Sequence, residues 1–344
     1  MKGVGFKMKK VTIQNIAAEL NLSRNTVAKA LNGGTVSYET RMTVVKKAKT
    51  MGYSKLSKQL IEEMDKATLE KKGGTILVLF DRADSLFWNK ILTGISDECS
   101  DRGFRMQLHI VDGRDSNGAE TKKLIEEDVC GIIFLCVFPV PFVEGLSKAK
   151  VPMVFLDAPT NAGEFMRYGD VITQEGWYSV YEMVNTVIKQ GKTEFAFIGY
   201  ENGSKSVHDR FDGFMNAMKV NNLPVDKRLI FTEKVQDDYY NYSVIENLVN
   251  GLPNMPEVFV CTNDDIAKYV AISLSKVDEK LAEEVVLIGF DNTIEETFFK
   301  KGIITANVRK EALGRKLVRS LMDQIDYPDK DFELTAIATY PMYN

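Results

Sequence analysis

Apolar residues near the start of the chain recur with the spacing of a short amphipathic helix. Ile13, Ile16, Ala17 and Leu20 fall at positions i, i+3, i+4 and i+7, and Thr12 stands before them where an N-cap belongs. This pattern predicts a helix of about two turns that buries one face.

Two further helices are predicted directly after it. Ser23 is a suitable N-cap for a helix whose apolar face is formed by Val27, Ala30 and Leu31 and which ends before a pair of glycines. Ser37 can cap the third helix. Two short helices joined by a tight turn, with a third packed against them, form a helix-turn-helix domain.

The polar face of the second helix carries side chains that can read DNA. Arg24 and Asn25 lie at the start of this helix, the end that enters the major groove in such a motif. Arg can bond bidentately to guanine and Asn to adenine. Short polar groups near helix N-termini are suited to phosphate contacts, namely Thr12, Ser23, Thr26 and Asn32. The alternative is that the hydroxyls only cap helices and the cations are solvated.

The charge of the chain is divided between two parts. The whole chain has a net charge of −4, but residues 1–58 contain twelve Lys or Arg and only two carboxylates, Glu19 and Glu39. That segment therefore carries +10, and the rest of the chain carries −14. A basic module joined to an acidic body is typical of a nucleic-acid-binding head on a globular core, although a solvated basic arm gives the same balance.

The head resembles the DNA-binding domain of the lac repressor (LacI/GalR) family of bacterial transcription regulators over about 45 residues. Four segments carry this resemblance: Thr12–Ala17, Leu22–Asn32, Val36–Arg41 and Ala48–Tyr53. It implies that Arg24, Asn25 and Lys29 contact bases, and that a homodimer binds a pseudo-palindromic operator in double-stranded DNA. We therefore expect a helix-turn-helix DNA-binding domain at residues 8–57.

The linker after Tyr53 departs from the family pattern. The family has a Pro-Asn pair there, followed by a short hinge helix with a Leu that wedges into the minor groove. Here Leu56, Leu60 and Met64 form an i, i+4, i+8 stripe, which fits either a longer dimerising helix or a shifted hinge with Leu56 or Leu60 as the wedge. We assign residues 58–74 to this hinge or linker helix, because the segment ends in a Gly-Gly pair typical of a domain boundary.

From residue 75 onward, apolar strand-like runs alternate with helical segments. The runs are Thr75–Phe80, Phe104–Ile110, Gly131–Val137, Met153–Leu156, Phe195–Gly199, Val258–Cys261 and Val285–Phe290. Strands that are apolar on both faces and spaced by helices predict buried parallel sheets joined by right-handed crossovers. The fold class is therefore α/β, and the number of strands favours two sheets and hence two lobes.

The family resemblance implies a bilobed, periplasmic-binding-protein-like core in which the chain crosses between the lobes three times. On that basis residues 75–344 form an effector-binding and dimerisation domain. Its N-lobe covers residues 75–169 and 293–319, and its C-lobe covers residues 170–292 and 320–344. Ligands of open α/β sheets bind at the carboxyl ends of the strands, which here predicts a site in the cleft between the lobes.

Polar and aromatic residues that follow the predicted strands are candidates for that site. They are Asp81, Arg82, Phe87, Trp88, Asp157, Arg210, Asn263 and Asp291. Carboxylates, amides and an Arg around a flat ring suit a carbohydrate, because they bond its hydroxyls while the ring covers its C–H face. Asp157, Arg210, Asn263 and Asp291 also match ligand positions of the family.

Each candidate also has a purely structural interpretation. One of Phe87 and Trp88 belongs to the core if they begin a helix, and an Asp after a strand often caps the next helix. Arg210 and Asp291 follow different strand–helix units. We therefore expect these two side chains to meet only when the cleft between the lobes closes on a polar ligand.

These observations favour a ligand-responsive DNA-binding repressor over two alternatives. A solute-binding component of a transporter shares the bilobed fold. Such a protein needs an export signal, and it has no use for a helix-turn-helix domain. An enzyme on a doubly wound fold is poorly supported, since the chain has no G-x-G-x-x-G turn after a strand, no P-loop and no nucleophile elbow.

Neither a cofactor nor a metal site is expected. The chain has only two histidines, and its four cysteines are scattered without a C-x-x-C pair, which is typical of reduced cysteines in a cytosolic protein. No apolar run is long enough to span a bilayer, and the start of the chain lacks the features of an export signal. We expect a cytoplasmic homodimer that binds operator DNA and a small carbohydrate-like effector, with no membrane partner.

Overall fold

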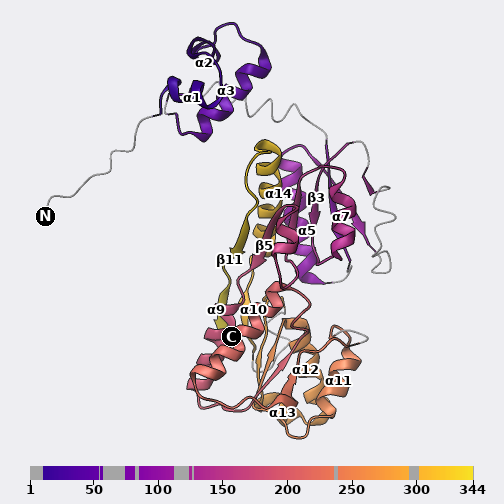
Figure 1. The fold of residues 1–344 in the computed structure, drawn as a ribbon. Coiled ribbons are helices and arrows are strands. Elements are labelled where there is room, and N and C mark those ends of the chain that lie inside the picture. The colour runs from indigo at the N-terminus through magenta and orange to yellow at the C-terminus, as the bar shows by residue number, and fades with distance from the viewer. Residues whose placement is uncertain are drawn as a thin grey trace, which may run out of the picture. The chain divides into compact units, whose positions relative to one another are not determined.

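The computed structural model describes residues 11–53, 55–56, 74–81, 85–111, 124–125, 128–235, 239–293 and 302–343 of the 344-residue chain. The chain divides into two compact units, residues 1–73 and residues 74–344. Figure 1 shows the helices and strands of the two units. Each unit has its own hydrophobic core. Across the described ranges, no helix is both long enough and apolar enough to cross a membrane.

The smaller unit contains the three predicted helices, α1 (Ile13–Glu19), α2 (Arg24–Leu31) and α3 (Tyr38–Thr50). The hydroxyls of Thr12, Ser23 and Ser37 each accept a hydrogen bond from the backbone N–H three residues later, so the predicted N-caps are confirmed. The core between the helices consists of small and branched residues: Ile16, Ala17, Val27, Ala30, Leu31, Val44, Val45 and Ala48. The predicted helix-turn-helix is therefore confirmed.

The larger unit is built on two six-stranded sheets. The first has the order β11-β5-β4-β3-β1-β2, and all of its neighbouring strands run parallel. Its strands are β1 (Thr75–Phe80), β2 (Arg105–Ile110), β3 (Val129–Phe134), β4 (Met153–Leu156), β5 (Asp170–Gln174) and β11 (Leu334–Ile337).

The second sheet has the order β12-β10-β9-β8-β6-β7. Its strands are β6 (Phe195–Ile198), β7 (Ile230–Phe231), β8 (Val258–Cys261), β9 (Val286–Ile288), β10 (Ile304–Asn307) and β12 (Tyr340–Tyr343). All neighbours are parallel except the edge strand β12, which pairs antiparallel with β10. The α/β class with two parallel-rich sheets is confirmed, with this one antiparallel edge as a correction.

Helices cover both faces of the first sheet, so alternate residues of its central strands enter different cores. In β1, Ile76 and Val78 pack with α5 (Leu86–Asp101) and α14 (Lys310–Asp326). Leu77 and Leu79 pack instead with α7 (Val140–Ser147) and α8 (Gly163–Met166). This burial on both faces explains why the strand is apolar throughout.

The second sheet is covered in the same way. Phe195 and Phe197 of β6 pack with α9 (Trp177–Lys189) and α10 (Lys205–Val220) on one face. Ala196 and Ile198 pack with α11 (Tyr242–Asn250) and α12 (Asp264–Val277) on the other, and the short α13 (Glu279–Glu284) follows α12. The carboxyl ends of both sets of strands thus lie between paired helices, where polar side chains gather.

All seven predicted apolar runs contain a strand, but five further strands escaped prediction: β5, β7, β10, β11 and β12. β5 begins with a buried aspartate, Asp170, whose carboxylate bonds Ser320 and Lys330. β11 and β12 lie at sheet edges; β11 exposes alternate residues, and β12 exposes its two end residues. Strands with buried polar groups or one solvated face do not give a continuous apolar run.

The predicted division of residues between the lobes is wrong at three strands. β5 and β11 belong to the first sheet although residues 170–174 and 334–337 were assigned to the C-lobe, and β10 belongs to the second sheet although it was assigned to the N-lobe. The chain still passes between the sheets three times: after β5, between β10 and β11, and after β11. The predicted positions of these crossings are wrong because the three strands were not predicted.

Candidate functional site

The polar face of α2 carries the residues predicted to contact bases. Arg24, Asn25 and Lys29 are exposed, whereas Val27 and Ala30 on the opposite face are fully buried in the head core. The first two occupy the first two positions of the helix. This is the arrangement in which a recognition helix presents its N-terminal residues to a major groove.

The four predicted phosphate contacts lie at helix ends. Ser23 accepts a hydrogen bond from the Thr26 N–H at 3.0 Å, and the two hydroxyls lie 2.8 Å apart. Thr12 forms a capping box at the start of α1. Asn32 is the C-cap of α2, so its predicted location near a helix N-terminus is wrong, because α2 extends to Leu31.

Only one of the two candidate wedge residues lies within the described residues. Leu56 is half-buried and packs against the head core, so its side chain is engaged within the head in this structure. Leu60 and the whole of residues 58–73, which make up nearly all of the predicted linker helix, lie outside the described residues.

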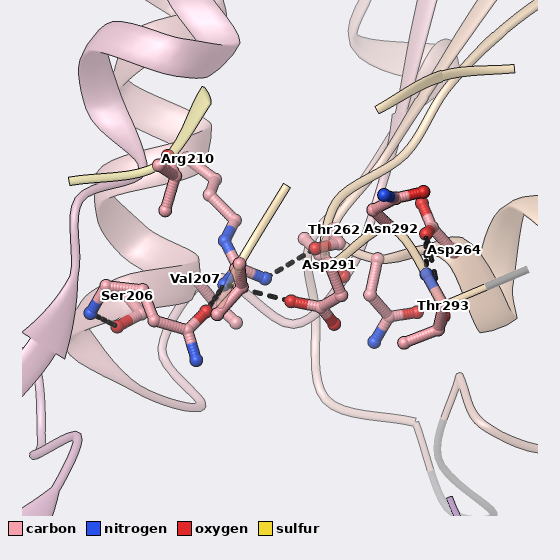
Figure 2. A network of polar contacts seen from close by, with 12 residues as sticks. Ser206, Val207, Arg210, Thr262, Asp264, Asp291, Asn292 and Thr293 are labelled. Carbon is pink, nitrogen blue, oxygen red and sulfur yellow. Dashed lines mark hydrogen bonds and ion pairs between the residues drawn. The ribbon is translucent and has the colours of Figure 1, made fainter. Parts of the chain in front are cut away.

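Arg210 is the centre of a buried polar cluster in the larger unit (Figure 2). It lies on α10, and its guanidinium donates to the Thr262 carbonyl oxygen at 2.6 Å and to the Gln174 Oε1 at 2.7 Å. The guanidinium also stacks 3.7 Å from the ring centre of Phe290. Gln174 ends β5 of the first sheet, so Arg210 joins the carboxyl edges of both sheets.

Asp291 faces this guanidinium, with its Oδ1 4.0 Å from the Arg210 Nη2 (Figure 2). The expectation that the two residues meet only around a ligand is therefore wrong. They belong to the same lobe, where Asp291 follows β9 and α10 packs against the same sheet. Asp291 and the next residue, Asn292, both have positive φ, 100° and 52°, which is a strained conformation for residues other than glycine.

Asp157 and Asn263 act first of all as helix caps. Asp157, which has a φ of 71°, follows β4 and accepts hydrogen bonds from the backbone N–H groups of Ala158 and Ser206, at 2.9 and 3.1 Å. Because Ser206 is in the first turn of α10, this carboxylate ties the first sheet to the second lobe. Asn263 caps α12 through Ile266 N–H, and its amide donates to the Tyr240 hydroxyl at 2.8 Å.

The remaining candidates are less closely joined to this cluster. Phe87 is only 7% exposed and belongs to the core, which corrects its assignment to the site. Trp88 is half-buried, with its ring centre 5.2 Å from that of Phe80. Asp81 is exposed at the end of β1, and Arg82 lies outside the described residues.

Burial perturbs the acids of this cluster. It raises the pKa of Asp264, the first residue of α12, to about 7, and the negative charge of Asp291 contributes in the same direction. Burial raises the pKa of Asp291 to about 6, against the opposing effect of Arg210 and Lys310. Clusters of shifted acids are frequent at ligand sites, and here they surround one guanidinium.

Two surface hollows within the described residues lie away from this cluster. One, of about 650 Å³, is lined by Trp177 and residues of α10, and the other, of about 410 Å³, lies near the amino ends of β4 and β5. Neither contains a residue predicted for the site. The buried network, and not a large hollow, is therefore what marks the candidate site.

Known structures and sequences resemble the chain over nearly its whole length. A transcriptional regulator described as a CelR-cellobiose complex superposes with a TM-score of 0.68, covering 97% of this chain and 99% of that one at 19% identity. The lac repressor dimer bound to operator and the anti-inducer ONPF gives a TM-score of 0.64, covering 97% and 98% at 17% identity. These likenesses establish the fold.

The sequence matches point the same way. The profile of the periplasmic binding protein-like domain matches residues 184–340. The HTH-type transcriptional repressor PurR of Shigella dysenteriae serotype 1 is 23% identical over 321 residues, which is 91% of this chain and 90% of that protein. The chain is thus similar over nearly its whole length to transcriptional regulators such as PurR and the lac repressor.

These relatives are described as transcriptional repressors or regulators, and the match to the periplasmic binding protein-like domain lies within the larger unit. The family resemblance found in the head is thus confirmed by matches that extend through both lobes.

Two residues of the polar cluster, Gln174 and Lys310, were not predicted for the site. Asp264 directly follows Asn263 and is a strand-end residue of the kind that the strand-end rule selects. Gln174 ends a strand that escaped prediction. The sequence does not indicate that Lys310 is buried, because a lysine at the start of an amphipathic helix is normally solvated.

Proposed function

We propose that this regulator is a repressor that binds a pseudo-palindromic operator as a homodimer, and that a small sugar-like effector held between the lobes controls its operator affinity. The corresponding domain map has the DNA-binding domain at residues 8–57, the hinge or linker at 58–74 and the effector-binding and dimerisation domain at 75–344. The observation that carries the proposal is an exposed, basic recognition helix in a chain that also has a buried polar cluster at its strand ends.

In the head, Arg24, Asn25 and Lys29 contact bases, and Thr12, Ser23, Thr26 and Asn32 contact phosphates. The exposure of the first three on one face of α2 supports this division, because bidentate readout needs long side chains free to enter the groove. The other four are short and partly engaged in capping, which suits contacts that position the head without specifying sequence.

In the effector domain, Asp157, Arg210, Asn263 and Asp291 hold the ligand, with Trp88 beside them. Arg210 Nε and Asp291 Oδ1 are buried and have no hydrogen-bond partner among the described residues. A polyhydroxylated ligand can satisfy such a donor and such an acceptor, since each hydroxyl both donates and accepts. The solved relative described as a cellobiose complex supports a carbohydrate as the first class to test.

Control of DNA binding follows from linkage between the two sites. If the effector favours one arrangement of the lobes, and that arrangement sets the spacing of the two heads in a dimer, operator affinity changes by a coupling free energy of typically ~1 to 3 kcal/mol. Tight half-site recognition requires two heads, because one head with few phosphate contacts binds weakly.

The test combines operator selection with ligand screening of the full-length protein. Duplexes selected from a random pool should contain an inverted repeat, and the protein should sediment as a dimer. A thermal-shift panel of mono- and disaccharides, polyols and nucleobases should identify a compound that raises the melting temperature, since ligand at about 100 times its dissociation constant stabilises by ~2.7 kcal/mol. Selected sites without symmetry, or a response confined to nucleobases, would contradict the dimer or the sugar-like effector respectively.

A further inference from the structure

Lys310 is an almost fully buried lysine at the first position of α14, with only 4% of its surface exposed. Its ammonium group donates to three main-chain carbonyl oxygens, those of Asp291, Asn292 and Val308, the last two at 3.1 Å. An ammonium group has three donors, so all of them are used. A lysine is almost never buried unless its charge is compensated.

Two of these acceptors belong to the turn that carries Asp291. Every peptide group from Asp291 to Thr293 has a partner: Asp291 N–H donates to the Ala306 carbonyl at 2.9 Å, and Asn292 N–H to the Thr305 hydroxyl at 3.3 Å. Thr293 N–H donates to Asp264 Oδ2 at 2.8 Å. The turn, with positive φ at two residues, is thus held between Asp264 of α12, shown in Figure 2, and Lys310 of α14.

Helix α14 itself belongs to the first lobe, where it lies against α5 at very close range. A Cβ placed on Gly94 would lie 2.1 Å from the Glu311 carbonyl oxygen, and one on Gly314 would lie 2.2 Å from that of Ile91. Arg319 of α14 also pairs with Glu98 of α5 at 3.0 Å. The two helices are therefore tightly packed against each other, and Lys310 joins this pair to the second lobe.

We propose that Lys310 is a positioning residue of the effector site: it holds the Asp291–Thr293 turn in its left-handed conformation and joins that turn to the α5–α14 pair of the first lobe. The role rests on the proposed function, because it becomes regulatory only if Asp291 contacts an effector. An effector that contacts Asp291 then influences the first lobe through the Lys310 side chain. No wider rearrangement of the core is needed.

The charges around this ammonium group fit the role. Asp291 and Asp264 face it, Glu311 lies on its own helix, and Lys90 of α5 acts against it. Arg210 lowers the pKa of Asp291 and Asp265 raises it. Burial lowers the pKa of Lys310, whereas it raises the pKa of Asp264 to about 7 and that of Asp291 to about 6.

The first experiment removes the ammonium group while keeping the length of the side chain. Lys310→Met is compared with Lys316→Met, the same change at a less buried position on the same helix. In Lys310→Met, the amides of Asn292 and Thr293 should exchange with solvent about tenfold faster or more, while amides in the middle of α5 keep their wild-type protection. Unchanged exchange at the turn, or an equal loss along α5, would overturn the proposal.

A second measurement reports on the charge of Lys310 and its position relative to Asp291, and not on the packing of its side chain. The titration midpoint of the Asp291 carboxyl, followed by carbon NMR, should move upward in Lys310→Met, because a cation that favours the ionised form is lost. Lys316→Met should leave it in place. An unmoved midpoint in Lys310→Met would mean that the ammonium group does not act on Asp291.

The link between the lobes is tested by a double substitution. Asp291→Asn should alter the exchange of the Leu313 and Gly314 amides in α14, and this effect should disappear in the Lys310→Met background. An effect of equal size in both backgrounds would show that the Asp291–Thr293 turn is coupled to α14 through contacts other than Lys310. None of these measurements uses an effector or DNA, so a failure of the sugar-like ligand proposal leaves them intact.

Discussion

The Nη2 of Arg210 lies 4.0 Å from the Oδ1 of Asp291, too far for a hydrogen bond although both side chains are buried. The guanidinium donates instead to the Thr262 carbonyl and the Gln174 side chain, which uses one N–H of each terminal nitrogen. Two buried atoms of the pair, Arg210 Nε and Asp291 Oδ1, have no hydrogen-bond partner within the described ranges. These two atoms are the ones that the proposed effector would satisfy.

The acids of this cluster predict an unusual dependence of stability on pH. Because the pKa of Asp264 is about 7 in the folded chain and about 4 when unfolded, the folded state binds more protons between these values. The free energy of unfolding should therefore fall as pH rises from about 5 to about 8. Acids with lowered pKa, such as Glu98 and Asp170, act in the opposite direction but only below about pH 5.

Urea unfolding of Asp264→Asn at several pH values checks this. The variant should lose less stability than the wild type between about pH 5 and pH 8, since it has no carboxyl to ionise there. Asp101→Asn, an exposed aspartate on α5, should follow the wild type. Parallel curves for wild type and Asp264→Asn would mean that Asp264 does not titrate in this window.

Base readout by α2 predicts different effects for two basic residues of the head. Arg24→Ala should relax specificity at one base pair of each half-site, by ~1 to 3 kcal/mol, while other positions keep their preference. Lys46→Ala, on α3, should weaken all sequences alike and reduce the slope of affinity against salt by about one. Binding of a set of single-base operator variants at two salt concentrations distinguishes the two patterns. A uniform loss for Arg24→Ala would make it a phosphate contact.

The sequence predicts those parts of the molecule whose pattern is local. The three helices of the head and their caps follow from 3.6-residue spacing and from Thr12, Ser23 and Ser37, since a hydroxyl cap acts within four residues. Strands that are buried on both faces, such as β1 and β4, are predictable because they form nearly continuous apolar runs.

Other features depend on contacts between distant segments. Asp170 opens β5 and looks like a loop residue until Lys330, far along the chain, pairs with it. Likewise, nothing near Lys310 in the sequence indicates that it bonds carbonyl oxygens on the other lobe. The meeting of Arg210 with Asp291 was misjudged for the same reason, because it depends on how α10 packs on the second sheet.

The close contact between α5 and α14 makes Gly94 a sensitive position. A methyl group at this position would overlap the Glu311 carbonyl, which is backbone and cannot rotate away. Gly94→Ala should therefore destabilise the larger unit by ~1 to 3 kcal/mol despite the higher helix propensity of alanine. Thr93→Ala, on the exposed face of the same helix, is the control and should change stability by less than about 0.5 kcal/mol. A stabilised Gly94→Ala would show that the two helices can separate without cost.

The Arg210–Asp291 pair gives the last prediction. Arg210→Met keeps much of the side-chain volume but removes one of the two cations that favour the ionised Asp291, so the pKa of Asp291 should rise above about 6. The variant should lose ~3 kcal/mol of stability at about pH 8 and clearly less at about pH 5, where Asp291 is protonated.

Loss of the bonds to Thr262 and Gln174 contributes equally at both pH values, so the difference between them isolates the charge of Asp291. Adding Asp291→Asn to Arg210→Met should remove that difference, because no buried carboxylate is then left without its cation. Lys205→Met, which breaks a half-buried ion pair with Asp209 on the same helix, should cost less than ~1 kcal/mol at either pH. If Arg210→Met loses the same amount at both pH values, the cation that compensates Asp291 is Lys310 and not Arg210.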